Sequence, residues 1–195
     1  MNTAKTVQTK TSSSARRSIS TKELVLAGMF AAVLAVISQI SIPMPTGIPI
    51  TIQILGVVLM GTVLGWRLSF LATLIYILLG AFGLPIFSNF RGGLFHLLGL
   101  TGGYIWGWLP MVLLCGIRPK TGSKSLNTIL IFLLPILGTL LDETIGGLQW
   151  AALSGELSIY GVFTYSMVTF VPKDILLTVI AVIMGIPVRK VVLRQ

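Results

Sequence analysis

The chain has 195 residues, of which 54% are hydrophobic and only 10% are charged, and its mean hydropathy is +0.96. Soluble domains carry about 25% charged residues, so this composition excludes an ordinary soluble enzyme, a disordered chain and a nucleic-acid-binding protein. It predicts an all-α membrane protein, a single bundle of six transmembrane helices, because each crossing takes roughly 20 apolar residues.

The first 22 residues are polar and rich in Ser, Thr, Lys and Arg, with no hydrophobic period. We expect residues 1–22 to form a disordered, basic cytosolic tail and residues 23–195 to form the membrane domain. A basic stretch before an apolar run can mimic a signal peptide. Here the basic stretch is long and no clean small-residue cleavage site follows, so the first apolar run is interpreted as a helix of the mature protein.

Six apolar runs follow, and each is predicted to cross the membrane. The fifth run is over-long for one crossing, so we expect it to be tilted or broken at Gly146 and Gly147. The run at residues 159–170 is too short to cross and precedes Pro172, which predicts an interfacial or re-entrant piece. The predicted spans are residues 24–40, 52–64, 68–82, 104–117, 126–153 and 174–193.

The basic residues fall in the connections between apolar runs, and cytoplasmic connections are the ones that are generally rich in Lys and Arg. With the N-terminus in the cytoplasm, only Arg91 and Lys173 of the 14 basic residues face outward. This distribution predicts a multi-pass protein of the cell (plasma) membrane with both termini cytoplasmic, and it accounts for the formal net charge of +9. The inner residues are Lys5, Lys10, Arg16, Arg17, Lys22, Arg67, Arg118, Lys120, Lys124, Arg189, Lys190 and Arg194.

The predicted outer connections are apolar, aromatic and shaped by Gly and Pro, unlike short polar turns. The segment SIPMPTGIPIT at residues 41–51 places three prolines within seven residues, which a helix cannot accommodate, and residues 83–103 are rich in glycine. Irregular backbone at membrane depth survives only where it is buried in protein or lines a cavity. We therefore expect folded-back outer loops over a small-molecule cavity, with a lid that binds no ligand as the alternative.

A few polar residues are candidates for such a cavity. Asp174 is predicted to open the last span beside Lys173, where it is either a hydrogen-bond acceptor for ligand N–H groups or a helix cap. Asp142 and Glu143 lie inside the fifth predicted span, where ionisable groups are costly and become functional candidates. The alternative is that these two lie near the outer interface, or that one of them pairs with Arg91 or Lys173.

No catalytic arrangement is evident, and the chain is predicted not to be an enzyme. Asn89, Arg91 and His96 lie in the glycine-rich loop. The sequence contains one histidine and one cysteine, Cys115. We therefore expect neither a metal site nor a cofactor. No phosphate-binding loop of the G-x-x-x-x-G-K-[ST] type is present. If transport is active, its energy must come from an ion or from a partner.

The first predicted span carries small residues at helical spacing. Ala27, Ala31 and Ala35 recur every four residues, and Gly28 and Ala32 form a parallel row. Small residues at this spacing allow close approach of another helix. That helix either belongs to the same bundle or to a separate docking protein.

Four segments in order, IPMPTGIPITIQILGVVLMG, LLGAFGLPIFSNFRGG, GLTGGYIWGW and FVPKDILL, resemble the BioY family, the biotin-binding substrate components (S components) of energy-coupling factor (ECF) transporters. The resemblance covers residues 24–190. It implies a six-helix membrane protein that captures biotin from outside and is energised by an ECF coupling protein and two cytosolic ATPases. The face formed by Ala27, Ala31 and Ala35 resembles the family's docking surface for the coupling protein.

The family usually shows Asp-x-x-Lys at the start of the last helix, whereas here Asp174 is kept, Leu177 takes the Lys position and Lys173 precedes the Asp. We expect Asp174 to accept from the ligand's N–H groups, and Arg91 or Lys173 to meet its carboxylate or ureido oxygen. A solitary secondary transporter driven by an ion gradient and a structural membrane protein are the alternative functions. The predicted substrate-binding residues are Asp174, Lys173, Asn89, Arg91, Tyr104 and Gln53.

Overall fold

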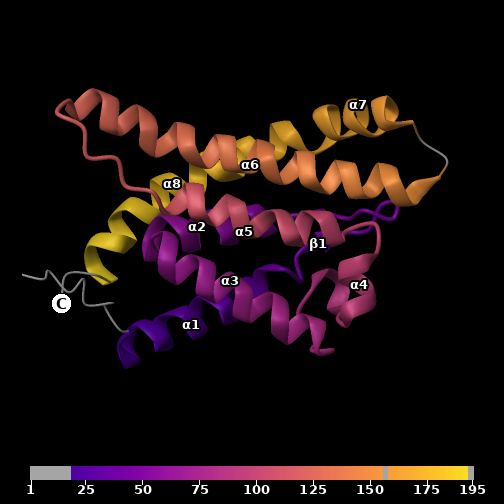
Figure 1. The fold of residues 1–195 in the computed structure, drawn as a ribbon, viewed down its shortest axis with the longest axis horizontal. Helices are drawn as coiled ribbons and strands as arrows, with labels where there is room; N and C mark the ends of the chain where they lie inside the picture. Colours follow the sequence, from indigo (N-terminus) through magenta and orange to yellow (C-terminus); the bar gives the residue numbers. More distant parts are fainter. Residues whose placement is uncertain (1–18, 156–157, 193–195) are drawn as a thin grey trace, which may run out of the picture.

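The computed structural model describes residues 19–155 and 158–192. This part of the chain is mostly helical, as predicted, with eight α-helices and one antiparallel pair of short strands that the sequence did not predict (Figure 1). The elements are α1 (Thr21–Ile37), β1 (Ser41–Ile42), β2 (Ile50–Thr51), α2 (Gln53–Leu64), α3 (Trp66–Ala81), the 3-10 turn η1 (Ser88–Phe90), α4 (Leu94–Leu98), α5 (Gly102–Gly116), α6 (Lys124–Ser154), α7 (Ile159–Thr169) and α8 (Val171–Val192).

Six of these helices, α1, α2, α3, α5, α6 and α8, coincide with the six predicted apolar runs. α1 begins at Thr21, inside the stretch expected to be a tail, because the side chains of Ser20 and Glu23 form a reciprocal capping box. By length and composition, α6 and α8 can each cross a membrane, while α2, α3 and α5 are apolar but shorter. The number of crossings remains a prediction.

The fifth predicted span is one unbroken helix, so the expectation of a possible break at Gly146 and Gly147 is wrong. α6 continues through both glycines and through Pro135. Gly146 faces α5, where a β-carbon would collide with the Tyr104 ring. The glycine therefore allows close contact between helices and does not interrupt α6. The short run that follows forms α7, an 11-residue helix packed on α6 and α8.

The centre of the bundle is α2, in which ten of twelve residues are buried. It packs against α8, α5, α1 and α3, and α5 in turn packs along α6. Close crossings use small residues: a β-carbon at Gly61 would meet Cys115, and one at Gly185 would meet Thr62. This packing explains why α2 is apolar on all sides, since a helix with such a surface is stable only when surrounded.

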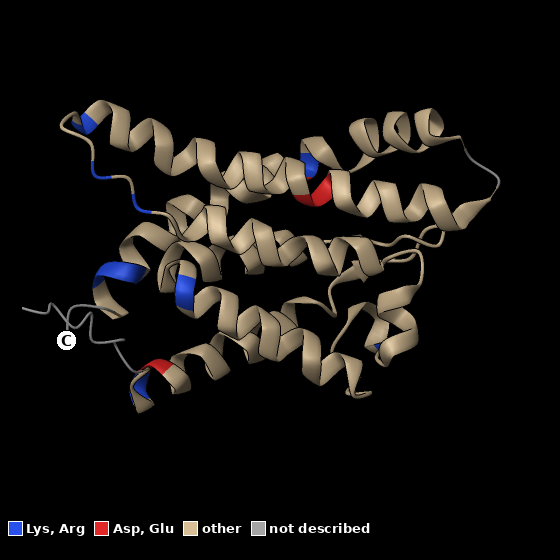
Figure 2. Cartoon of the chain, viewed as in Figure 1, with Lys and Arg blue, Asp and Glu red and all other residues tan. Residues whose placement is uncertain are grey.

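The two ends of the bundle differ in charge (Figure 2). We call "basic end" the end formed by the start of α1, the α2–α3 junction, the α5–α6 connection and the last turns of α8. We call "loop end" the end formed by the β1–β2 hairpin, residues 82–101 and α7. The described cations of the basic end are Lys22, Arg67, Arg118, Lys120, Lys124, Arg189 and Lys190. Lys5, Lys10, Arg16, Arg17 and Arg194 lie outside the described residues.

A candidate ligand-binding cavity

The glycine-rich loop is folded back against the helices by side chains that reach its backbone. Gln39 Nε2, just beyond α1, donates to the carbonyl oxygens of Ile86 and Phe87 at 3.3 Å each, and its Oε1 accepts from the N–H of Phe90 at 2.9 Å. The Tyr76 hydroxyl, from α3, donates to the same Ile86 carbonyl at 2.6 Å. These bonds fasten residues 86–90 to α1 and α3.

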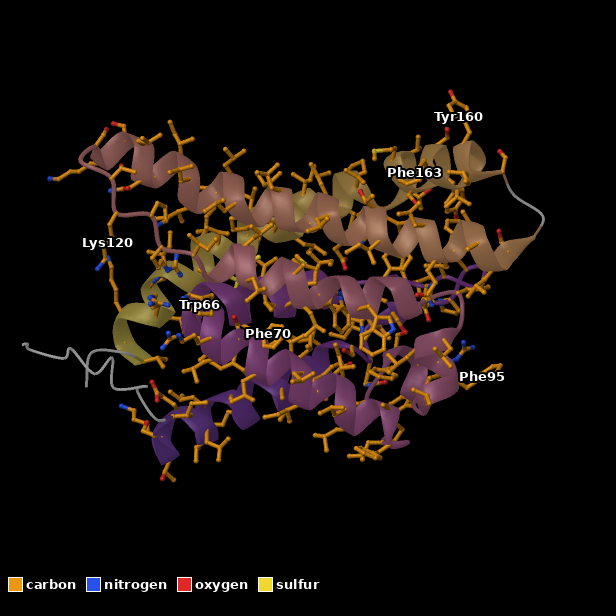
Figure 3. The ribbon with its side chains drawn as sticks, in the orientation of Figure 1. Trp66, Phe70, Phe95, Lys120, Tyr160 and Phe163 are labelled. Atoms are coloured by element: carbon orange, nitrogen blue, oxygen red, sulfur yellow. The ribbon has the colours of Figure 1, made fainter. Side chains whose placement is uncertain are left out.

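The second half of this loop is attached to α5 and α6. Gln149 Nε2 donates to the carbonyl oxygens of Leu97 at 3.2 Å and Gly99 at 2.7 Å. Trp106 Nε1 also donates to the Leu97 carbonyl, at 3.2 Å. α4 is therefore held over the loop end of the bundle, with the exposed ring of Phe95 pointing away from it (Figure 3).

A cavity lies beneath these loops, with about 560 Å³ of empty space, part of it open to solvent. Its apolar wall combines the hairpin, α2, α5 and the α7–α8 junction through Ile48, Pro49, Ile54, Tyr104, Ile105, Trp108 and Phe170. Its polar lining comprises Thr51, Gln53, Ser88, His96, Thr101, Asp142, Glu143, Lys173 and Asp174.

Aromatic edge-to-face contacts stiffen the wall beneath α7. The Tyr104 and Phe170 rings lie 6.3 Å apart between centroids, and Phe170 and Tyr165 lie 5.8 Å apart. Tyr165 also contacts Trp150, at 5.5 Å. Such pairs add stabilisation beyond the area they bury. They join α5, α6 and the α7–α8 junction on one side of the cavity.

An ion pair joins α8 to the hairpin. Lys173 Nζ pairs with Asp174 Oδ1 and also donates to the Thr51 carbonyl oxygen at 2.8 Å. Asp174 is 3% exposed and lies in the first turn of α8, which begins at Val171. Asp174 is therefore not the residue at which the helix begins, because three residues of α8 precede it.

Two further carboxylates face the cavity from the middle of α6. Asp142 is 0% exposed and Glu143 is 4% exposed. Neither oxygen of Asp142 has a hydrogen-bond partner within residues 19–155 and 158–192, and the same holds for Glu143 Oε2. Within that part of the chain, the ion pair of Lys173 is with Asp174 and not with either α6 carboxylate.

His96 contributes a neutral polar edge to the cavity. Its ring stacks on Phe87 with 5.4 Å between centroids, and its Nε2 lies 3.2 Å from Thr101 Oγ1. Burial, and then the positive charge of Arg91, lower the pKa of His96 below its ordinary value. The imidazole is therefore uncharged at neutral pH, and its Nε2 donates or accepts one hydrogen bond with Thr101 Oγ1, depending on the tautomer.

Four of the six predicted substrate-binding residues lie together on the cavity wall: Asp174, Lys173, Tyr104 and Gln53. They come from α8, α5 and α2. Trp108 and Phe170 also line the cavity, although no sequence pattern marks them as site residues. In the sequence, each is an aromatic residue within an apolar segment. Aromatic residues of the core look the same, so this feature does not indicate a ligand contact.

The other two predicted residues, Asn89 and Arg91, are exposed and do not line the cavity. The turn η1 directs Ser88 inward and Asn89 outward, where its Oδ1 accepts from Ser41 Oγ at 2.9 Å. The Arg91 carbonyl accepts from the N–H of Phe87 at 2.9 Å, which closes the turn. These residues shape the loop above the cavity and do not form its wall.

The predicted docking face on α1 is largely covered by the chain's own helices. Ala27 is 0% and Ala31 5% exposed, and Ala35 is half-buried, because α1 packs against α3 and α2. Ala27 and Ala31 therefore contact helices of the same bundle, and docking of a separate protein on this face remains a prediction. The parallel row of Gly28 and Ala32 is exposed.

These features define a helical membrane protein with a cavity beneath its folded-back loops, lined by aromatic, acidic and basic side chains. The sequence model of the BioY family matches residues 8–194. The chain belongs to the BioY family, as the sequence segments predicted. Because this is a family of transporter components, the prediction that the chain is not an enzyme is also confirmed.

Relatives of known name agree with this assignment. The "Probable biotin transporter BioY" of Pyrococcus horikoshii is 35% identical over 164 residues, covering 84% of this chain and 94% of the relative. The "Biotin transporter BioY" of Rhizobium etli is 34% identical over 175 residues, covering 86% and 92%.

The fold matches the crystal structure of "the S-component for biotin from an ECF-type ABC transporter". The TM-score is 0.74, with 87% of this chain and 91% of that chain covered. Sequence identity to that structure is 23%, so this match establishes the fold alone.

Proposed function

We propose that this chain is the substrate-capturing membrane subunit of an ECF-type transporter and that its substrate is biotin. The observation that carries the proposal is the cavity, which encloses carboxylates and one lysine between aromatic walls beneath folded-back loops. The names of the relatives and the fold shared with a biotin S component support it.

The chemistry of biotin matches this lining. Its ureido ring offers two N–H donors and one carbonyl oxygen, its sulfur-containing ring is apolar, and its tail ends in a carboxylate. Asp174 is suited to accept an N–H, and Lys173 to meet the ureido oxygen or the tail carboxylate. The rings of Tyr104 and Trp108 provide apolar surface for the fused rings.

Equilibrium binding of labelled biotin to the purified chain in detergent tests this function. We expect saturable binding that excess unlabelled biotin displaces and that an unrelated carboxylic acid of similar size does not. Absence of saturable binding by folded protein would contradict the proposal.

We further propose that the loop end faces outward and the basic end, with both termini, faces the cytoplasm. The described cations of the basic end support this orientation, since cytoplasmic connections are enriched in Lys and Arg. Phe95 and Lys120 are exposed at opposite ends (Figure 3). An impermeant thiol reagent applied to intact cells should label Phe95→Cys and spare Lys120→Cys. Labelling of the second variant alone would reverse the orientation.

We also propose that an ECF coupling protein with two cytosolic ATPases energises uptake and docks along α1. A shallow groove beside α1 is lined by Gly28, Ala31, Ala32 and Ala35 together with α3 residues, and small residues let a partner helix approach. Tagged chain should co-purify two ATPases and a coupling protein from its host. Co-purification of none of them, with uptake intact, would instead support a solitary transporter driven by an ion gradient.

The exposure pattern of α1 makes the docking face testable. Ala32→Leu adds bulk on the exposed row and should reduce uptake while leaving biotin binding nearly intact. Val33→Leu, at an exposed position that does not line this groove, is the matched control. Equal uptake by the two variants would exclude the Gly28–Ala32 row from docking.

A further inference from the structure

We propose that Asp142 is a specificity-determining residue that accepts a hydrogen bond from the second N–H group of the ligand's ureido ring. This inference rests on the proposed function, because it assigns a role within the same cavity. It separates the cavity acids into Asp174, which is held by Lys173, and Asp142, which has no hydrogen-bond partner among the described residues.

The first observation is that Asp142 is buried without a partner. Its side chain lines the cavity, it is 0% exposed, and neither of its oxygens receives a hydrogen bond from the described residues. Buried polar atoms in folded proteins are almost always hydrogen-bonded, and each exception calls for an explanation. A donor supplied by a bound ligand is such an explanation.

The second observation is the close approach of the neighbouring helix to Asp142. α5 places Gly107 against Asp142, so closely that a β-carbon at Gly107 would collide with the Asp142 side chain. The glycine thus leaves room for the carboxylate and holds it between α5 and α6. The nearest cation that lines the cavity, Lys173, already bonds to Asp174 and to the Thr51 carbonyl.

The remaining acids of the cavity are placed differently. Asp174 carries the ion pair with Lys173, and Glu143 lies within electrostatic range of both. A neutral ring with two N–H donors requires two acceptors on the cavity wall. Asp174 supplies one beside Lys173, and Asp142, on a different helix, supplies the other. A site that accepts a hydrogen bond from a ligand binds an analogue without that donor much more weakly, because the acceptor of the site is then left unpaired.

The experiment uses the full-length chain in detergent and two probes. One is biotin, and the other is its cyclic carbonate analogue, in which oxygen replaces each ureido N–H without changing ring size. The variant Asp142→Asn conserves the shape of the side chain next to Gly107 and replaces one acceptor oxygen with an amide NH₂ donor. Thr144→Val, two residues further along α6, is the matched control, because Thr144 does not line the cavity and its hydroxyl bonds to the Leu140 carbonyl.

We expect Asp142→Asn to weaken biotin binding by about tenfold to a hundredfold, the range for leaving a buried hydrogen-bonding group without its partner. Binding of the carbonate analogue should change much less, and Thr144→Val should bind both probes as the parent does. If Asp142→Asn does not fold, binding of the two probes to the parent chain still tests the proposal. Equal affinity of the parent for biotin and for the carbonate analogue would overturn it.

The outcomes separate the two levels of inference. Biotin binding by the parent with an unchanged affinity in Asp142→Asn would mean that the ligand makes no hydrogen bond to this side chain, and the role of Asp142 would be refuted while the proposed function stood. A folded parent that binds no biotin would refute the proposed function and, with it, the assignment of Asp142.

Discussion

The two ends of the molecule use charged residues in opposite ways. At the basic end the cations lie on short connections and at helix termini, where they are exposed or bond to backbone carbonyls (Figure 2). Beneath the folded-back segments of the loop end, three carboxylates and one lysine from the middle of α6 and the start of α8 face a cavity. Charge at the first end therefore caps helices, and charge at the second end lies on the wall of a cavity.

The capping at the basic end centres on α2. Arg189 Nη1 donates to the Val63 carbonyl at 2.8 Å, and Arg118 donates to the Thr62 carbonyl. Both carbonyls belong to the last turn of the helix, where its dipole favours cations. Burial, and then the charge of Arg189, lower the pKa of Arg118 to about 10, so it remains charged at neutral pH. Gly65 follows with a φ of +79°, which lets α3 begin at once.

This contrast predicts that substitutions at the loop end change ligand affinity, whereas substitutions at the basic end change stability. The largest effect is expected at Gly146, where α6 meets the cavity wall. In Gly146→Ala the new methyl group would collide with the Tyr104 ring, and overpacking of this kind costs about 1–3 kcal/mol. We expect a lower thermal transition in detergent and at least about tenfold weaker biotin binding.

The adjacent glycine is the matched control for that variant. A β-carbon at Gly147 would meet only the Phe163 and Val162 side chains at ordinary contact distances of 3.8 to 4.0 Å. Gly147→Ala should be neutral, or stabilising by about 0.5–1 kcal/mol through helix propensity. Similar losses of stability and biotin affinity in both variants would show that α6 tolerates no substitution here. Collision with the Tyr104 ring would then not explain the effect of Gly146→Ala.

The next effect concerns the ion pair at the start of α8. Asp174→Asn removes the charge that holds Lys173, so biotin binding should weaken by about tenfold or more. Arg118→Gln, at the basic end, should leave the affinity nearly unchanged. Isothermal titration of the two variants against the parent measures the difference. Equal affinities of Asp174→Asn and the parent would reduce Asp174 to a residue that only positions α8.

A smaller effect is expected for the cap on α2. Arg189→Gln removes the charged donor to the Val63 carbonyl, and we expect a loss of about 1 kcal/mol in stability. Biotin affinity should not change, because Arg189 lies at the opposite end from the cavity. Thermal unfolding in detergent, read alongside a binding curve, checks both statements. Much weaker biotin binding by Arg189→Gln would contradict the statement that the two ends have separate roles.

The smallest effect is a pH dependence through His96. Its pKa is lowered in the folded state, so above about 6.5, the ordinary value, both folded and unfolded forms are neutral and His96 contributes no dependence. Below that pH the unfolded chain binds a proton that the folded chain resists, and stability falls. His96→Gln should lessen this fall between about pH 6.5 and pH 5. An identical stability profile in parent and variant would contradict the lowered pKa.

The structure also separates what a sequence pattern can locate from what it cannot. The proline-rich segment correctly predicts an end to the first helix, because proline cannot continue one. It does not predict the hairpin, in which Ser41 pairs with Thr51, since that pairing depends on the contacts made at both ends. The side-chain chemistry of Asn89 and Arg91 predicts ligand contacts, but a single 3-10 turn points Asn89 away from the cavity.

The sequence by itself determines the membrane class, the apolar helices and the family, because these follow from composition, run length and segments that are contiguous along the chain. It also identifies Asp142, Glu143, Lys173 and Asp174 as the acids and the base worth attention. Only the tertiary structure decides that Asp174 forms an ion pair and that Asp142 has no hydrogen-bond partner among the described residues. The reason is that α6, α8 and the hairpin are distant in sequence, and hydrogen-bond partnership depends on atoms within about 3 Å of one another.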